Sequence, residues 1–207
     1  MLAIRQIGLV PYPSGLIEQA RAAAEVRDGP SRGVVLVTRH PPSITLGRRA
    51  DPAELHLSRW DRRALGIDLY HVDRGGGATY HYPGQAVVYP VLHLGRLGLT
   101  VAGLLDALSG ALGALLLDHG VRGTWDPERP GMYVGGAKVA SVGLHVRGEV
   151  TTHGLALNVG PGCDGFRHID PCKVRGLPVT SLAHLIGYEP DPDAVGLDLG
   201  RRIAAAL

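Results

Sequence analysis

The feature that most constrains the fold of this chain is a mixture of strand-like and helix-like segments along its whole length, with no internal repeat and no linker. We expect strands over residues 2–9, 33–38, 66–73, 85–94, 133–134, 138–146 and 150–159, and helices over residues 14–27, 101–117, 178–186 and 193–206. Ser14 and Thr100 are the expected N-caps of the first two helices. The pattern predicts a single α+β domain over residues 1–207, with a mixed β-sheet flanked by helices.

Composition removes several classes of function. Lys and Arg number 21 against 19 Asp and Glu, so no strong field favours nucleic acid or a membrane surface as a partner. Only two cysteines are present, Cys163 and Cys172, which is too few for a disulfide framework and favours a reducing cytoplasm. The N-terminus lacks the apolar core of a signal peptide. The apolar stretch 101–117 contains Asp106 and glycines, and we expect it to fall short of a membrane span.

A glycine-rich segment, RGGGATYHYPGQ at residues 74–85, is the first candidate for a functional site. Three successive glycines after a strand expose backbone N–H groups that can face a carbonyl or phosphate oxygen. The spacing matches neither a Walker A loop nor a dinucleotide fingerprint. A plain hairpin turn explains the glycines about equally well, but Arg74, Tyr80 and His81 favour a site.

The second candidate is Lys138, within the apolar pattern GGAKVASVG of residues 135–143. Lys138 and Lys173 are the only lysines in a chain that otherwise uses arginine. A buried lysine can exchange a proton, whereas arginine stays charged. The alternative is a solvated lysine on an edge strand.

The third candidate is Cys172, which follows a proline in an irregular stretch and is therefore presented by a loop. Most free cysteines are inert small hydrophobic residues. Cys163 is the rival nucleophile, but its neighbours supply no cation and Asp164 opposes thiolate formation. A Cys–His pair of Cys172 with His81 or His153 also remains open.

Metal binding is the least favoured of these readings. His168 and Cys172 have a tolerable spacing for zinc, but no second ligand pair follows them. We expect no metal and no cofactor.

Together, and in this order, these segments resemble the lipoyl(octanoyl) transferase family. The matching motifs are RGG-x-x-TYH-x-PGQ at residues 74–85, K-[IV]-A-[SA]-[IV]-G at 138–143, HG-[FL]-ALN at 153–158, PC at 171–172 with VTSL at 179–182, and an early loop, HPP with TLG, at 40–47. Each motif is weak alone, but several ordered motifs over roughly residues 5–185 are specific.

The resemblance implies a fold like that of the biotin and lipoate protein ligases. It implies transfer of an octanoyl group from acyl carrier protein to a lysine of lipoyl domains, those of the 2-oxoacid dehydrogenase complexes and the glycine cleavage protein. By the same resemblance Cys172 carries the acyl group as a thioester and Lys138 supports it. The implied substrate site comprises Arg74, Gly75, Gly76, Gly77, Ala78, Thr79, Tyr80, His81, Ser141, Val142, Gly143, Gly154, Leu155 and Ala156.

Two residues depart from the family pattern. Tyr82 stands where glycine is usual, which would narrow the loop or change its φ. Lys173 follows the Pro-Cys pair where glycine is common, and adds a second cation near the thiol. Gly77 makes the segment somewhat like that of the ATP-dependent lipoate ligases.

Reaction chemistry assigns Lys138 more than an electrostatic role. A neighbouring ammonium raises the thiolate fraction of an ordinary cysteine but lowers its nucleophilicity, for a net gain of only about threefold. We therefore expect Lys138 to move protons between Cys172 and the two substrates. Backbone N–H groups of residues 75–77 or of Cys172 are the candidate oxyanion donors. Val142 and Leu155 are expected to line a slot for the octanoyl chain.

Two other functions remain open from the sequence. An ATP-dependent lipoate or biotin ligase would need nucleotide but no covalent cysteine. A catalytically silent module for acylated carriers would bind without turnover.

Overall fold

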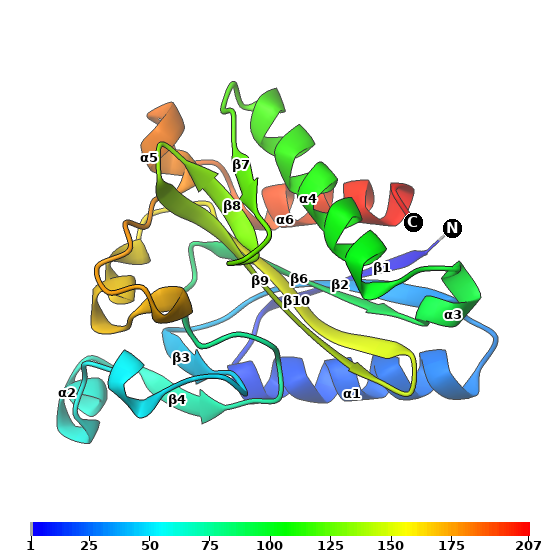
Figure 1. Ribbon diagram of the computed structural model, residues 1–207, viewed down its shortest axis with the longest axis horizontal. Coiled ribbons are helices and arrows are strands. Elements are labelled where there is room, and N and C mark those ends of the chain that lie inside the picture. Colours follow the sequence, from blue (N-terminus) through cyan, green and yellow to red (C-terminus); the bar gives the residue numbers. More distant parts are fainter. Residues whose placement is uncertain (1) are drawn as a thin grey trace.

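The larger of two β-sheets forms the centre of the molecule (Figure 1). The structure is a computed structural model that describes residues 2–207. This sheet has seven strands in the order β1-β2-β6-β10-β9-β8-β7. Their bounds are β1 (Ala3–Leu9), β2 (Gly33–Arg39), β6 (Gln85–Leu92), β7 (Thr124–Asp126), β8 (Gly131–Val134), β9 (Ala137–Arg147) and β10 (Val150–Asn158). Strands β1 and β2 are parallel and the other pairs antiparallel, so the predicted α+β domain with a mixed sheet is confirmed.

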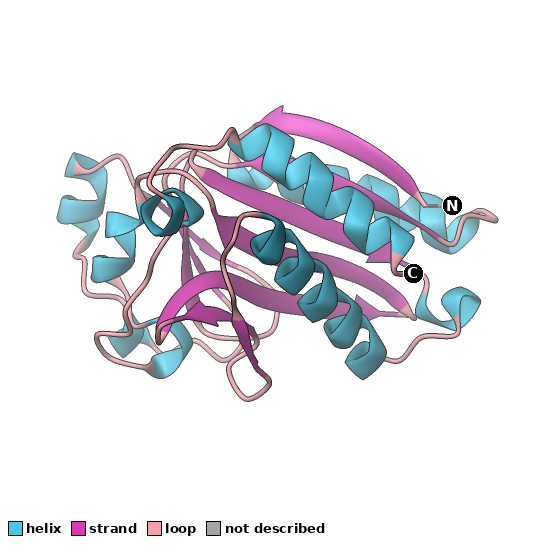
Figure 2. Cartoon of the chain, turned by 90° about the horizontal axis from the view of Figure 1, so that it is seen from above, coloured by secondary structure: helices cyan, strands magenta, loops and turns pink. Residues whose placement is uncertain are grey.

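Helices cover both faces of this sheet. Helix α1 (Tyr12–Asp28) packs on one face, and α4 (Val101–Asp118) and α6 (Pro192–Ala205) cover the other (Figures 1 and 2). Along β2, Val34 and Leu36 join the core beneath α1, whereas Val35 joins the core beneath α4 and α6. Burial on both faces explains why this strand is apolar without interruption.

A second sheet of three strands lies at one end of the first, and only one of its strands, within residues 66–73, is predicted from the sequence. Its strands are β3 (Ser43–Leu46), β4 (Asp68–His71) and β5 (Ala78–His81), in the order β4-β3-β5. Short elements surround it: α2 (Arg59–Ala64) and the 3-10 turns η1 (Pro52–Glu54), η2 (Cys163–His168) and η3 (Pro171–Lys173). Strands of four residues are too short to show a clear alternation, and β5 is hidden inside the glycine-rich segment.

Some predicted boundaries are wrong for local reasons. Helix α1 begins at Tyr12, and its N-cap is Pro11. The fixed φ of Pro13 suits the first turn of a helix. Ser14, the predicted N-cap, therefore lies inside the helix. The strand expected over 85–94 ends at Leu92, before the short helix α3 (Leu94–Leu97).

The predicted helix over 178–186 is wrong for its first part. Only α5 (Leu182–Ile186) is helical. The preceding residues are extended, since Val179 forms a bridge to Lys138 and the Lys138 N–H donates to the carbonyl of Pro178 at 2.8 Å.

The expectation that residues 101–117 fall short of a membrane span is wrong as far as length and composition go. Thr100 caps helix α4 as predicted, by accepting the Gly103 N–H at 3.0 Å. Its 18 residues are long and apolar enough to cross a membrane by length and composition. In the structure, however, one side of the helix, including Leu104 and Leu108, is fully buried in the core beneath it.

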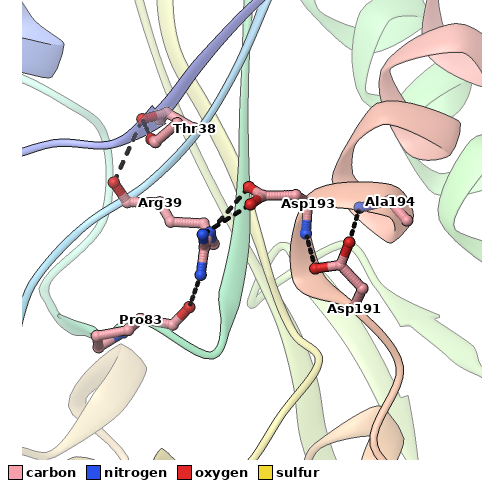
Figure 3. A network of polar contacts seen from close by, with 7 residues as sticks. Thr38, Arg39, Pro83, Asp191, Asp193 and Ala194 are labelled. Carbon is pink, nitrogen blue, oxygen red and sulfur yellow. Dashed lines mark hydrogen bonds and ion pairs between the residues drawn. The ribbon is translucent and has the colours of Figure 1, made fainter.

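An ion pair joins α6 to the end of β2, and a hydrogen bond from the same arginine reaches the loop that follows β5 (Figure 3). Arg39, at the end of β2, donates to both carboxylate oxygens of Asp193 at 2.8 and 2.6 Å and to the carbonyl of Pro83 at 3.2 Å. Asp191 caps α6 by accepting the N–H groups of Asp193 and Ala194. Because Pro83 belongs to the glycine-rich segment, this contact ties the segment to the main sheet.

Candidate functional site

Lys138 and Cys172 meet in the structure. The amine Nζ of Lys138 lies 3.0 Å from Sγ of Cys172, within hydrogen-bond distance for sulfur. Lys138 is the second residue of β9 and only 1% exposed. Gly131 on β8 makes room for it, since a Cβ there would lie 2.7 Å from Cε of Lys138. A solvated edge-strand lysine is therefore excluded.

Cys172 is presented by the η3 turn in an unusual backbone conformation. Its φ is +58° and that of Lys173 is +61°, a left-handed region that non-glycine residues seldom adopt. The turn is anchored by Pro171, which is buried, and by the Asp170 N–H, which donates to the Glu54 carbonyl at 2.8 Å. The thiol itself is partly exposed. A partly exposed thiol beside an amine has the setting of a nucleophile.

Cys163 lies elsewhere and lacks a cation. It lines a separate depression with Asp164 and Thr180. Burial, reinforced by Asp164, raises the pKa of the Cys163 thiol. This residue is an unfavourable nucleophile, as its sequence neighbours indicate.

The glycine-rich segment is held against the site by Glu54. The buried carboxylate of Glu54 accepts the N–H of Ala78 at 2.6 Å and that of Asp51 at 2.7 Å. A Cβ at Gly77 would overlap this carboxylate, so only glycine fits. The Gly75 N–H donates to Leu144 of β9 at 2.8 Å, which joins the segment to the strand that carries Lys138.

Arg74 places a second cation beside the site. Its guanidinium is almost fully buried and donates to the carbonyl and hydroxyl of Thr45 at 2.7 and 2.9 Å, and to the Gly75 carbonyl at 2.9 Å. It has no carboxylate partner within salt-bridge distance among residues 2–207. Its positive charge therefore acts on the cavity next to Cys172.

That cavity is a narrow slot with a volume of about 60 Å³. Most of the predicted substrate residues line it, together with Lys138 and Cys172: Arg74, Gly76, Gly77, Ala78, Thr79, His81, Ser141, Val142, Gly143, Gly154, Leu155 and Ala156. Its exposed lining is mainly apolar. The shape and lining suit an alkyl chain.

Two of the predicted substrate residues lie outside the slot. Tyr80 faces the opposite side of β5, where its ring packs on Phe166 and Tyr82, because successive side chains of a strand point to opposite faces. Gly75 lines the neighbouring groove on the outer side of Cys172.

Five further residues outside the implied substrate set line the slot: Tyr12, Val87, Tyr89, His153 and Pro171. Val87 and Tyr89 follow Gln85 at intervals of two along β6, so the period of a strand would have found them. His153 begins the HG-[FL]-ALN motif, and its strand setting predicts both a pocket-lining role and an alternative pairing with the thiol; the first of these is observed. No pattern in the sequence around Tyr12 indicates that this residue lines the slot.

His153 does not pair with Cys172. Its Nε2 contacts Oδ1 of Asp73 at 2.8 Å, and His145 reaches Oδ2 of the same carboxylate at 3.3 Å. Burial lowers the pKa of His153, against the pull of Asp73, so the ring is neutral and donates to the carboxylate. Asp73 directly precedes Arg74. The contact between Asp73 and His153 therefore orients the start of the glycine-rich segment.

His81 is not the partner of Cys172 either. Its Nδ1 contacts Gln85 Oε1 at 2.8 Å, and burial lowers its pKa well below the usual value. Within residues 2–207 no group of three or more His, Cys, Asp or Glu side chains is placed to hold a metal ion.

Comparison with protein families shows to which family this chain belongs. The model of the lipoyl protein ligase A/B catalytic domain matches residues 16–203, which is most of the chain. The chain belongs to this family. Among curated proteins, a Syntrophobacter fumaroxidans protein named octanoyltransferase is 42% identical over 84% of this chain and 74% of its own length. An octanoyltransferase of Stutzerimonas stutzeri is 40% identical over 90% and 82%. The predicted family and its enzyme class are confirmed.

Solved structures of the lipoyl protein ligase family share the fold. A bipartite lipoate protein ligase from Thermoplasma acidophilum, described with its E2 lipoyl domain, has a TM-score of 0.71 at 17% identity, covering 100% of this chain and 84% of that one. The biotin protein ligase of Aquifex aeolicus has a TM-score of 0.55 at 14% identity, covering 100% and 69%. The predicted likeness to the biotin and lipoate ligase fold is confirmed.

The two departures from the family pattern have different outcomes. Tyr82 does not line the slot and keeps a negative φ; its buried hydroxyl donates to the Gly160 carbonyl at 3.2 Å. The expected change of φ is therefore wrong, and the ring packs closely against Gly84 and Gly162. Lys173 is exposed and lines the groove outside Cys172, so it adds a cation near the thiol as expected.

Proposed function

We propose that residues 1–207 form one catalytic domain that transfers an octanoyl group from acyl carrier protein to a lysine of a lipoyl domain through a thioester on Cys172. The observation that carries this proposal is the 3.0 Å contact between Lys138 and Cys172 at the mouth of an apolar slot. No described residue other than Cys172 places a thiol there.

In the first step Lys138 accepts the proton of the Cys172 thiol, and the thiolate attacks the thioester carbonyl of the donor. The tetrahedral intermediate collapses by breaking the bond to the carrier's sulfur. Lys138 returns the proton to that departing thiolate, which leaves as a thiol. The products are the acylated Cys172 and neutral Lys138.

In the second step the unprotonated amine of the lipoyl-domain lysine attacks the acyl-Cys172 carbonyl. Lys138 accepts one proton of the attacking nitrogen and passes it to the departing sulfur of Cys172. An amide bond forms as the thioester bond breaks, and both side chains return to their starting states.

Two features of the site stabilise the oxyanion of each tetrahedral intermediate in this proposal. The N–H groups of Gly76 and Gly77 border the slot and have no hydrogen-bond partner among residues 2–207. Each such donor is worth about 3 kcal/mol in comparable sites. The buried charge of Arg74 adds a favourable field.

The partners follow from the same chemistry. The lipoyl domains of 2-oxoacid dehydrogenase complexes and of the glycine cleavage protein are the proposed acceptors, in keeping with the lipoyl domain that accompanies the T. acidophilum relative. Both cysteines are free thiols. Because Cys172 must stay reduced to act, we place the enzyme in the cytoplasm.

Acyl loading followed by intact mass measurement tests the proposal. Incubated with octanoyl acyl carrier protein, the wild-type chain gains one octanoyl group, Cys163→Ser gains it equally, and Cys172→Ser gains no thioester. Loss of the adduct in Cys163→Ser with retention in Cys172→Ser would refute the assignment. Formation of pyrophosphate from ATP and free octanoate would favour the ATP-dependent ligase, and stoichiometric binding without transfer would favour a silent module.

A further inference from the structure

A second cavity opens on the outer side of Cys172. It has a volume of about 400 Å³ and shares Gly76, Gly77, Val142, Gly143 and Cys172 with the acyl slot. The sulfur therefore stands at the junction of two cavities. We call the second one the outer groove.

One wall of the outer groove is apolar. Val101 and Leu105, on the first turns of α4, face Leu144 of β9 across it. Val101 is 43% exposed, and Leu105 beside it is half-buried. An apolar, solvent-open wall suits a ligand that carries aliphatic groups.

The rim of the outer groove is basic. It carries Arg49, Arg129 and Lys173 against one carboxylate, Glu128. Arg129 is held by Asp126 at 2.7 Å. Arg49 and Lys173 are exposed and, within residues 2–207, their side chains make no ion pair or hydrogen bond. Two free cations thus remain for an anionic ligand.

Lys173 is retained at a conformational cost. Its φ of +61° follows the +58° of Cys172, so two successive non-glycine residues adopt the left-handed region. Such outliers persist where function needs the side chain. The η3 turn places Lys173 on the rim, one residue from the reacting sulfur.

We propose that the outer groove binds the pantetheine arm of the acyl donor, and that Lys173 and Arg49 bind the phosphate at the far end of that arm. The proposal rests on the proposed function, because the acyl chain must fill the slot while the thioester carbonyl lies at Cys172. The rest of the donor then leaves through the outer groove. Its dimethyl group meets Val101 and Leu105, and its phosphate meets the two cations.

The test compares three octanoyl donors: the pantetheine thioester, the 4′-phosphopantetheine thioester and the acyl carrier protein thioester. The quantity measured is the ratio of kcat/KM for the phosphorylated small donor to that for the unphosphorylated one. Lys173→Gly, which tolerates the positive φ, and Arg49→Gln each lower this ratio about fivefold, as expected for a solvent-exposed ion pair of about 1 kcal/mol.

Arg175→Gln is the matched control. Arg175 is exposed, lies two residues from Lys173 and faces a different depression, so its substitution leaves the ratio unchanged. An unchanged ratio in Lys173→Gly and Arg49→Gln would overturn the inference. A loss confined to the carrier-protein donor would overturn it too, and would assign the cations to the carrier's acidic surface. If wild type loads octanoate from none of the donors, the proposed function itself fails.

Discussion

The amine of Lys138 and the sulfur of Cys172 lie 3.0 Å apart although 34 positions separate the residues in the chain. Lys138 is held by β9, and Cys172 by a turn tied to Glu54. The two therefore reach each other from independently anchored elements. The contact between Lys138 and Cys172 is therefore preorganised by the fold.

If Lys138 moves protons, retention of its charge alone is insufficient. We expect Lys138→Arg to lower the rate of acyl loading by at least about a hundredfold, because guanidinium does not release a proton in the working pH range. Lys138→Met, of similar length, gives a similar loss and controls for side-chain volume. Single-turnover mass measurement supplies the rates, and thermal unfolding checks the fold. Wild-type loading by Lys138→Arg would remove proton transfer from the mechanism.

Substitution of Gly77 tests how the glycine-rich segment is positioned. A methyl group at Gly77 overlaps the Glu54 carboxylate and disturbs its bonds to the N–H groups of Ala78 and Asp51. We expect Gly77→Ala to lower the free energy of unfolding by about 1–3 kcal/mol and to impair acyl loading. The control is Gly110→Ala on α4, where a Cβ meets nothing within 4 Å. That change stabilises by up to about 1 kcal/mol, and an equal effect of the two substitutions would contradict this account.

Stability falls in acid because His40 is buried in its neutral form. Its Nδ1 contacts the Val10 carbonyl and its Nε2 the Tyr89 hydroxyl, both at 2.8 Å, and burial lowers its pKa to about 4. The unfolded chain binds the proton more tightly, so the contribution is complete above about pH 6.5 and is lost as the pH falls toward 4. The full loss is about 3 kcal/mol.

Denaturant unfolding at pH 7.5 and pH 5 measures this effect. His40→Gln loses part of the difference between the two pH values, since the buried imidazole is absent. His184→Gln, on the exposed side of α5, keeps the difference unchanged. An unaltered pH dependence in His40→Gln would assign acid sensitivity to other groups.

The Arg39–Asp193 pair is expected to stabilise the fold. Its side chains are only 23% and 29% exposed, and Asp193→Asn weakens two charged hydrogen bonds. We expect a loss of about 1–2 kcal/mol in the free energy of unfolding. Arg5→Gln, which breaks a pair of half-exposed side chains with Glu25, changes it negligibly. Equal losses from the two substitutions would show that burial does not matter here.

Much of the main sheet was predictable because its long strands carry clear apolar patterns. The strands β9 and β10 and their glycine turns illustrate this. Strands β3 and β5 of the second sheet are missed because they have four residues each and one lies within the glycine-rich segment. The prediction of helix for residues 178–180 is wrong because the local sequence carries no sign of their pairing with β9.

The sequence also indicates only those site residues that are unusual in their own segment, and not those that tertiary contacts bring to the slot. Lys138 and Cys172 stood out because each is unusual in its own segment. Tyr80 was misplaced because the motif does not say which face of β5 is the substrate face. Tyr12 was missed because only folding brings α1 against the slot.

One strand carries both Lys138 and the slot wall formed by Val142 and Gly143. Inserting a single residue between them would turn one set of side chains to the opposite side of the sheet. The spacing along β9 is therefore fixed, and adaptation to other acyl lengths must change the walls that other elements contribute, such as α1, β6 and β10.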